Sequence, residues 1–296
     1  MKPSVNAAYL FLIAVWSTTA LGIKWGVQGL PFTLALASRF VLAAVLMLGW
    51  LAWRRQSLPL AAPYRRAYWI AGLATACSMC CSFWAAQAVS SGLIAIIFGL
   101  SPLATAIFAS RWLGNQLDRR EWLAIALGLA GLLIIFARQL HWQADGGWRL
   151  LALCVAMALQ SGAAVLLKRF ASGLSPWLVN AGALQIAALT TLLFWLLAGA
   201  PWVSHWPWRT AVALIYLAAV GSVLGFSLYY WLIRECRPMS VALIALITPA
   251  SSLWLGHALN AETLQSHELI GTACIMLGLA VHVWASRREM PTNQPS

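Results

Sequence analysis

The feature that most constrains this sequence is a succession of apolar stretches, each about as long as a membrane-spanning helix. A helix needs about 20 apolar residues to cross the hydrocarbon core of a bilayer. Stretches of this kind cover residues 6–26, 31–52, 67–88, 91–113, 120–137, 147–168, 176–198, 210–232, 239–259 and 267–285. A soluble domain could not bury so much apolar surface, because 62% of the residues are hydrophobic and 9% are charged. The sequence therefore predicts an all-α membrane protein with ten transmembrane helices.

One part of this pattern occurs twice. Residues 101–134 return without a gap as residues 248–281, at a constant offset of 147 positions, which is 249 − 102. The matched pairs include Pro102 with Pro249, Leu117 with Leu264, Glu121 with Glu268, Ala126 with Ala273, Gly131 with Gly278 and Leu132 with Leu279. Apolar identities alone would mean little, but a proline, a glutamate and a glycine hold the same register across two helices and a loop. The chain is therefore expected to be a duplicated half.

The duplication also predicts how the two halves are arranged. We expect a first five-helix repeat over 1–140, a second over 147–286 and a disordered cytoplasmic tail over 287–296. Because five is an odd number, the second copy must cross the membrane in the opposite direction to the first. Two inverted repeats are a common way to build a carrier whose inward-open and outward-open states have similar energies. The expected fold is thus two inverted five-helix repeats that work by alternating access.

The positions of Lys and Arg predict the orientation in the membrane. Most of the 19 cations fall at one set of helix ends, namely Lys2, Arg54, Arg55, Arg65, Arg66, Arg111, Arg119, Arg120, Lys168, Arg169, Arg234, Arg237, Arg287 and Arg288. The opposite ends hold only Lys24, Arg138, Arg149 and Arg209. Cytoplasmic loops are enriched in Lys and Arg, so both termini are expected in the cytoplasm. The net charge of +12 is then explained by topology rather than by a nucleic-acid partner.

Arg39 is the one cation well inside a predicted span, about two turns from its outer end. An arginine there costs about 2.5–3.5 kcal/mol on insertion scales. The seven acidic residues all fall in loops or at span ends, so none is placed to pair with it. Arg39 either extends toward the interface or faces a wet cavity, where it would bind a carboxylate or phosphate of a substrate. Lys24 is interpreted as an interfacial anchor or as a second cation for an anionic substrate.

Pro102 and Pro249 stand near the centres of the fourth and ninth predicted spans. Proline has no N–H to donate and clashes with the preceding turn, so the carbonyls of Phe98 and Ala245 lose their normal partners. Transmembrane prolines are also tolerated without a function. The matched placement in the two copies favours a pair of hinges beside a cavity.

Polar and aromatic side chains recur inside several of the predicted spans. As substrate-binding candidates we select Trp16, Ser17, Arg39, Phe83, Trp84, Gln87, Gln160, Asn180, Tyr229, Tyr230 and Ser252. The alternative for a single Ser or Thr is a hydrogen bond to its own helix. Gly221 and Gly225 form a GxxxG pair, which is typical of close helix packing.

Motifs for metal binding and catalysis are missing from the sequence. Cys77, Cys80 and Cys81 lie in an apolar stretch and are interpreted as small buried thiols rather than a metal site. There is no HExxH, GxSxG or phosphate-binding loop and no pair of aspartates. We therefore expect no enzyme, no cofactor and no metal; the expected partners are a small-molecule substrate and membrane lipids.

The pattern as a whole resembles the drug/metabolite transporter superfamily, in its EamA branch. The resemblance covers nearly the full chain. It is carried in order by Trp16-Ser17, Arg39, Ser90-Ser91-Gly92-Leu93, the Pro102 region with Gly114-Asn115-Gln116, Thr248-Pro249, Glu262, and the helix with Gly271 and Gly278. The Gly-Glu pair that is usual at the ends of spans four and nine is altered: Asn115 replaces the first Glu, and Ala261-Glu262 stands for the second pair.

The resemblance implies a secondary carrier of the bacterial inner membrane, a monomer or homodimer, often exporting amino acids or other small metabolites. Family members enclose a central cavity between two four-helix clusters, with spans five and ten at the periphery. Without an acidic residue inside the spans, proton antiport lacks its usual relay group, so exchange or facilitated diffusion stays equally open.

Four functions are weighed on this basis. The leading one is a carrier for small amphipathic metabolites, amino acids first, with aromatic ones favoured by the Trp and Tyr content. The second is a carrier for phosphorylated or other anionic metabolites that uses Arg39 and Lys24. The third is a lipid-handling or assembly protein without a soluble substrate, and a membrane enzyme comes last.

Overall fold

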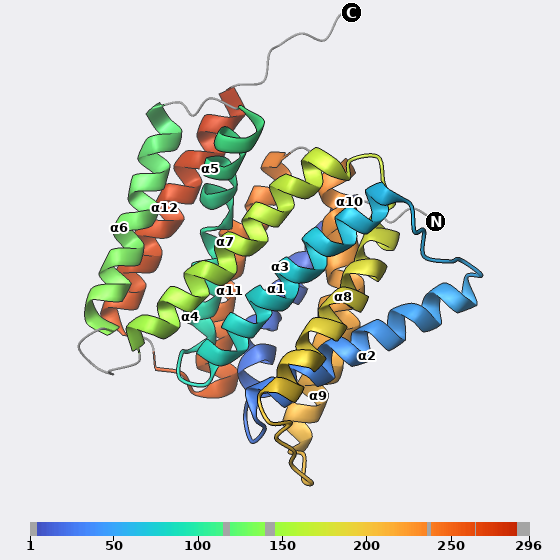
Figure 1. Cartoon of the computed structure of the whole chain (residues 1–296). Coiled ribbons are helices and arrows are strands. Elements are labelled where there is room, and N and C mark those ends of the chain that lie inside the picture. The colour runs from blue at the N-terminus through green and yellow to red at the C-terminus, as the bar shows by residue number, and fades with distance from the viewer. Residues whose placement is uncertain (1–4, 115–118, 140–145, 236–237, 264, 289–296) are drawn as a thin grey trace, which may run out of the picture.

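The computed structural model describes residues 5–114, 119–139, 146–235, 238–263 and 265–288. Within these residues every regular element is helical (Figure 1). In chain order the elements are α1 (Val5–Gly26), α2 (Phe32–Trp53), α3 (Ala62–Ala86), α4 (Ser91–Gly99), α5 (Ser101–Leu113), α6 (Arg119–Gln139), α7 (Gly146–Phe170), α8 (Pro176–Leu197), α9 (Trp208–Tyr216), the π-helix η1 (Leu217–Gly225), α10 (Phe226–Glu235), α11 (Pro238–Asn260) and α12 (Ser266–Arg288).

The helices follow the apolar stretches of the sequence. By length and apolar composition, seven helical segments of the described chain can cross a membrane. They are α1, α2, α3, α4 with α5, α7, α8, and the run from α9 into α10. The helices α6, α11 and α12 occupy the positions of the other three expected stretches. Arg287 and Arg288, which were assigned to the tail, belong to α12, and the rest of that tail lies outside the described residues.

Proline and glycine mark several helix ends. Pro63 and Pro176 lie in the first turns of α3 and α8, and Pro31 and Pro207 immediately precede α2 and α9. Proline suits a helix start because the N–H that it lacks would have no partner inside the helix there. At the other end, Gly114 stops α5 in the left-handed conformation, at a φ of 75°.

Large apolar side chains cover much of the outer surface. They include Leu10, Val45, Leu48, Leu133, Leu189, Leu193, Val212, Ile215 and Leu277, all of which are exposed. An apolar surface of this extent would drive aggregation in water, but it is the surface that lipid chains solvate. The outward face of the helices thus fits a protein surrounded by lipid.

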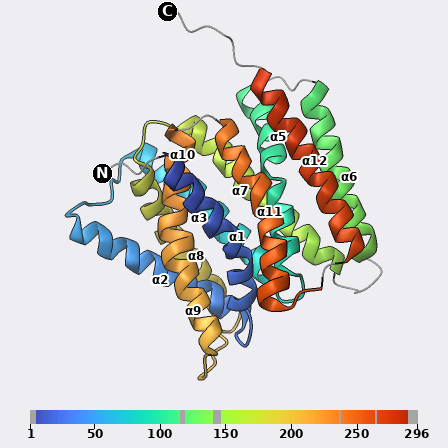
Figure 2. The same ribbon diagram turned by 180° about the vertical axis from the view of Figure 1, so that it is seen from behind.

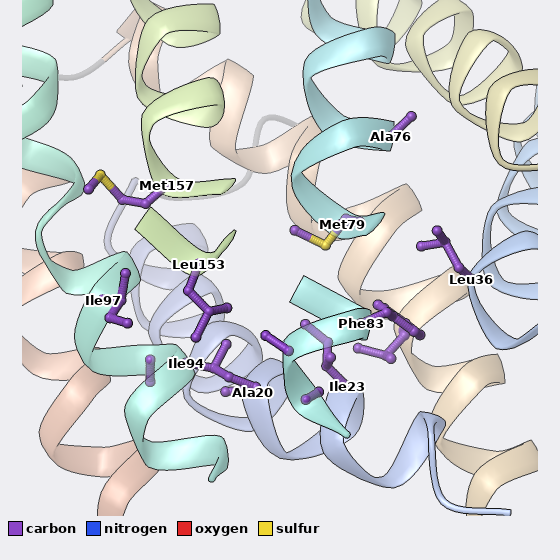
Figure 3. Close-up of a cluster of buried hydrophobic side chains, with 14 of the residues drawn as sticks. Ala20, Ile23, Leu36, Ala76, Met79, Phe83, Ile94, Ile97, Leu153 and Met157 are labelled. Carbon is purple, nitrogen blue, oxygen red and sulfur yellow. The ribbon is translucent and has the colours of Figure 1, made fainter. Parts of the chain in front are cut away.

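The interior contacts between helices come in matched sets. The helix α3 packs against α7 and α8, while the run α9–η1–α10 packs against α1 and α2. The helix α1 lies against α11 as α7 lies against α5. Shifting the residue numbers by 147 converts each of these helix pairs into another pair of the same set. The core where α1, α2, α3, α4 and α7 meet is filled by apolar side chains, among them Ile23, Phe83, Ile94 and Leu153 (Figure 3).

The helices α6 and α12 form a pair at one edge of the molecule, apart from α2 and α9 (Figures 1 and 2). A Cβ atom on Gly131 would lie 2.5 Å from the carbonyl oxygen of Gly271, and a Cβ on Gly278 would lie 2.8 Å from that of Ala124. The two backbones therefore touch directly, as small residues permit in membrane helices. We call these contacts the α6–α12 seam. Exchanging the two halves converts one contact into the other.

The fourth and ninth expected spans differ in continuity. In the first copy the helix is interrupted at Leu100, so that α4 ends at Gly99 and α5 restarts at Ser101 with Pro102 in its first turn. In the second copy α11 runs without a break from Pro238 to Asn260 and contains Pro249 in its interior. The two halves thus carry the same proline in two different backbone states.

Candidate substrate site

The side chain of Arg39 points into the molecule from α2. Only 1% of its surface is exposed, and its Nε donates to Ser222 Oγ of η1 at 3.2 Å. Its Nη1 lies 3.5 Å from the sulfur of Met79, and its guanidinium carbon lies 5.7 Å from the ring centre of Phe83. Met79 and Phe83 both come from α3, one turn apart (Figure 3). These partners are neutral, so they orient the guanidinium without neutralising its charge.

The π-helix η1 supplies the polar groups that surround Arg39. Ser222 Oγ donates to the carbonyl oxygen of Leu217, five residues back, at 2.9 Å. Asn180 of α8 donates through Nδ2 to the carbonyls of Ser222 and Val223, at 3.1 and 3.2 Å. A π-helical turn exposes backbone groups that an α-helix would satisfy internally, and such turns occur often at functional sites. Arg39, Asn180 and η1 thus form one buried polar network.

A second group of candidates gathers where α1 meets α10 and α11. The rings of Trp16 and Tyr229 have their centres 4.9 Å apart, and Tyr229 lies 5.8 Å from Tyr230. Ser252 Oγ donates to the carbonyl oxygen of Ser17 at 2.8 Å. The hydroxyl of Ser17 is buried without a hydrogen-bond partner in the structure. A buried hydroxyl without a partner is costly, which makes this a place where a bound solute could donate or accept.

The remaining candidates lie elsewhere. Gln87 is exposed just after α3, and its Nε2 donates to the carbonyl of Trp84 at 3.1 Å. Trp84 stacks with Arg149, whose guanidinium carbon lies 4.9 Å from the ring centre. Gln160 is half-buried on α7. The structure therefore does not gather these three with Arg39.

Lys24 lies in the last turn of α1, and its role as an interfacial anchor stays a prediction. Its Nζ donates to the carbonyls of Ala86 and Val89, at 2.8 and 2.9 Å, where α3 ends and the chain turns toward α4. A cation at the C-terminal end of a helix is stabilised by the helix dipole as well as by these bonds. The ammonium group is thus engaged by the protein and does not stand beside Arg39.

The carbonyl that the proline should leave without a helical partner is bonded by a neighbouring hydroxyl in the first copy. The hydroxyl of Ser101 donates to the carbonyl oxygen of Phe98, the group that Pro102 leaves without its helical partner. In the second copy the hydroxyl of Thr248 donates to the carbonyl of Ile244, at 2.7 Å. The break at Leu100 is therefore stabilised by a side chain that directly precedes the proline.

Sequence reasoning missed two neighbours of Arg39, namely Ser222 and Met79. The signal for Ser222 was present, because it is a serine between the glycines of the GxxxG pair. A Cβ on Gly225 would lie 3.6 Å from Val15 of α1, and one on Gly221 would lie 3.7 Å from Arg39 Nη2, so close packing through this pair stays a prediction. A π-helix there could not be read from the sequence. Cys77 also differs from expectation, because it is exposed rather than buried.

Comparison with known proteins identifies the family. The profile of the EamA-like transporter family matches residues 6–137 and again residues 147–284. An uncharacterized inner membrane transporter, YedA of Escherichia coli strain K12, is 28% identical over 280 residues, which cover 93% of this chain and 89% of YedA. A probable amino-acid metabolite efflux pump of Salmonella typhimurium is 25% identical, with 94% of each chain covered. A crystal structure with 20% identity superposes with a TM-score of 0.69 and covers 97% of this chain and 99% of its own, which supports the fold. With both halves matched by the same profile, the chain belongs to the EamA-like transporter family.

Proposed function

We propose that this protein is a secondary carrier that exports small amphipathic metabolites, amino acids first among them, across a bacterial inner membrane. Its two five-helix halves, 1–140 and 147–286, are inverted repeats that alternate access to a site between them, with both termini in the cytoplasm. It acts without chemical conversion of its substrate. Family membership supports transport, and the matched helix contacts of the two halves support the inverted arrangement.

The observation that carries the substrate class is the guanidinium of Arg39, which is buried among neutral partners. A charge removed from water is costly unless an opposite charge compensates it. The carboxylate of an amino acid supplies that charge and can accept two parallel N–H bonds from the planar fork. The rings of Trp16 on α1 and of Tyr229 and Tyr230 on α10, which follows η1, offer apolar faces, which favours substrates with an aromatic or large apolar side chain.

A carrier for phosphorylated or other anionic metabolites is the second candidate. It also uses Arg39, and the sequence offers Lys24 as a second cation. The structure engages Lys24 with two backbone carbonyls instead. A site with a single cation fits one negative charge, so we favour carboxylates over phosphates. A non-transporting role in lipid handling or assembly is left as an outcome of the test.

The test is counterflow in liposomes that contain the purified protein. We expect labelled amino acids, aromatic ones most of all, to accumulate against an internal pool of the same compound, and phosphorylated metabolites to accumulate much less. Empty liposomes and liposomes with the Arg39→Ala variant are the controls. Metabolite analysis of cells with and without the protein then identifies the natural substrate. If no solute accumulates in the liposomes and no metabolite is exported by the cells, the transport proposal is wrong.

A further inference from the structure

Among the described residues, one set of polar contacts between the two halves lies outside the substrate site. It joins the start of α4, in the first half, to the connection between α11 and α12, in the second half. The Glu262 carboxylate accepts from the backbone N–H of Ser91 through Oε1 and Oε2, at 3.1 and 3.0 Å. It also accepts from the Ser91 hydroxyl at 2.8 Å and from the Gly92 N–H at 3.4 Å. All four of these contacts would be lost if the halves separated at this end.

Two further bonds extend the contact to α1. Asn260 donates through Nδ2 to Glu262 Oε1 at 2.9 Å, and its Oδ1 accepts from the indole N–H of Trp25 at 2.9 Å. One chain of hydrogen bonds therefore runs from α1 through the end of α11 to α4. We call Glu262, Ser91, Gly92, Asn260 and Trp25 the latch.

The backbone that presents Glu262 is shaped for this contact. Ala261 follows the last residue of α11 in the left-handed conformation, with a φ of 50°, and Glu262 N–H donates back to the carbonyl of Gly256 at 3.2 Å. This bond reaches back six residues across a left-handed residue and closes the end of α11. An alanine in that conformation is disfavoured, by about 1 kcal/mol. The strained residue is retained where it places the carboxylate on α4.

Two glycines let α4 and α11 come close enough for the latch. A Cβ on Gly256 would lie 2.5 Å from Glu262 Oε2 and 2.7 Å from Ser91 Oγ. A Cβ on Gly92 would lie 2.5 Å from the Leu253 side chain. Among the described residues, α11 packs extensively against α4 and only marginally against α5. The helix α11 is thus close to α4 at the latch and diverges from α5 away from it.

Charge makes this contact stronger than an ordinary polar pair. A carboxylate at the N-terminal end of a helix meets unpaired N–H groups and the positive end of the helix dipole. Lys24 attracts the same carboxylate electrostatically. Glu262 lies in a connection between helices, so water can solvate its carboxylate when it leaves α4. The latch can therefore open and close without moving the Glu262 carboxylate into the hydrocarbon core of the membrane.

We propose that Glu262 is the gating residue of one side of this carrier, and that release of the latch is the step that opens this side. The proposal rests on the alternating access of the proposed function. The expected topology places the latch at the outer surface, because α4 and the connection from α11 to α12 begin there. The structure then represents a state that is closed to the outside.

The sequence of the other half indicates that the opposite gate is built differently. At the 147-residue offset, Glu262 corresponds to Asn115, Ser91 to Pro238, and Gly92 to Met239. Gly256 corresponds to Ala109. At these four matched positions the other half thus has no carboxylate, no serine hydroxyl and neither glycine. Because the matched positions lack the charged latch, we expect the resting carrier to favour the state in which the latch side is closed.

The test measures access to a buried position from each side of the membrane. In a variant without the native cysteines, Ser252→Cys provides a reporter about 12 Å from the end of α11, at 1.5 Å per residue. The probe is a membrane-impermeant maleimide, applied to intact cells or to inverted vesicles. Replacing a charged acceptor by a neutral one costs enough to change an equilibrium about tenfold. We therefore expect Glu262→Gln to raise labelling from the outside about tenfold, without raising labelling from the inside.

The matched control is Glu268→Gln, because the Glu268 carboxylate accepts from Gln265 N–H beside its own helix and does not bridge the halves. It should leave labelling unchanged from both sides. If Glu262→Gln fails to fold, Gly256→Ala and Ser91→Ala test the same contact with the carboxylate intact, and both should raise outside labelling. Equal labelling of Glu262→Gln and the parent, or an equal rise from both sides, overturns the proposal. Labelling needs no substrate. A negative labelling result therefore contradicts the gate at Glu262, whereas a negative counterflow result contradicts the proposed transport.

Discussion

At the scale of single residues, Arg39 combines full burial with partners that carry no charge. Its Nε reaches a serine hydroxyl, one Nη reaches a thioether and its plane lies near an aromatic ring. These groups hold the position of the guanidinium and leave its charge to be matched by something else. A bound carboxylate would match that charge, which gives the residue a part in affinity rather than in folding alone.

We expect Arg39→Ala to weaken substrate binding about tenfold or more, because the loss of a charged, paired hydrogen bond costs about 1.5–3 kcal/mol. Counterflow at several substrate concentrations measures this as a rise in KM. The control is Lys168→Ala, which removes an exposed cation at the far end of α7. Unchanged affinity and rate in Arg39→Ala, at equal amounts of folded protein, would show that the guanidinium serves only to connect α2 with η1.

At the scale of elements, the two proline-containing spans show what the same residue does in two contexts. Pro102 begins α5 after an interruption, whereas Pro249 is held inside an unbroken α11. A proline in the first turn of a helix loses no bond, but one in the interior costs about 3 kcal/mol or more. A helix that already lacks one bond bends at that point with little further cost.

We expect Pro102→Ala and Pro249→Ala to slow transport without lowering thermal stability, because each restores a backbone donor. The new N–H at position 102 can reach the Phe98 carbonyl and join α4 to α5, whereas the one at 249 stiffens α11. As the two spans are inverted copies, the variants should favour opposite states. Side-specific labelling of the Ser252→Cys reporter reads this directly.

The control for these two variants is Pro59→Ala, in the connection between α2 and α3, which keeps the carbonyl that accepts from Tyr68. A double Pro102→Ala, Pro249→Ala variant with full transport and unchanged labelling from both sides would show that the prolines have no part in alternating access.

At the scale of the whole molecule, the distribution of cations defines an orientation that can be measured. Exposed Arg and Lys side chains gather at the ends where α2 meets α3 and α7 meets α8, among them Arg54, Arg65, Lys168 and Arg169. Moving several such charges across a bilayer is prohibitive, and cytoplasmic loops carry the excess of them.

We expect a reporter that is active only in the cytoplasm to give a signal when it is fused after Ser296. A reporter that is active only outside the cytoplasm should be silent at that position and active when inserted in the connection between α8 and α9. The reverse pattern would invert the topology and would place the latch on the cytoplasmic side.

The sequence was sufficient for the helices and insufficient for their irregularities. Apolar length alone located α1 and α2 to within a residue or so, because a membrane span leaves little choice of length. Apolar length could not show that the helix is interrupted before Pro102 and continuous through Pro249. The hydroxyl–carbonyl bonds around each proline depend on local geometry that apolar length does not contain. The π-helix was equally hidden, because the groups that stabilise it, such as Asn180, come from another span.

For the candidate site, burial and pairing were harder to foresee than residue type. Arg39 stood out because a charge in an apolar stretch needs a reason. Its contacts with Ser222 and Met79 depend on which faces of α2, α3 and η1 meet, and spacing along one helix does not contain that information. Gln87 illustrates the converse: a polar residue near the end of an apolar stretch is exposed just beyond α3 and bonded to the carbonyl of Trp84.

The α6–α12 seam has a consequence for how the two halves can move. Its contacts, Gly131 with Gly271 and Ala124 with Gly278, exchange with each other when the halves are exchanged, as in an isologous dimer interface. Sliding one helix along the other would break both contacts together, because their backbones are already in touch. Rotation about the line that joins the two contacts breaks neither. If the halves move relative to each other in alternating access, we expect them to turn about the seam rather than to slide along it.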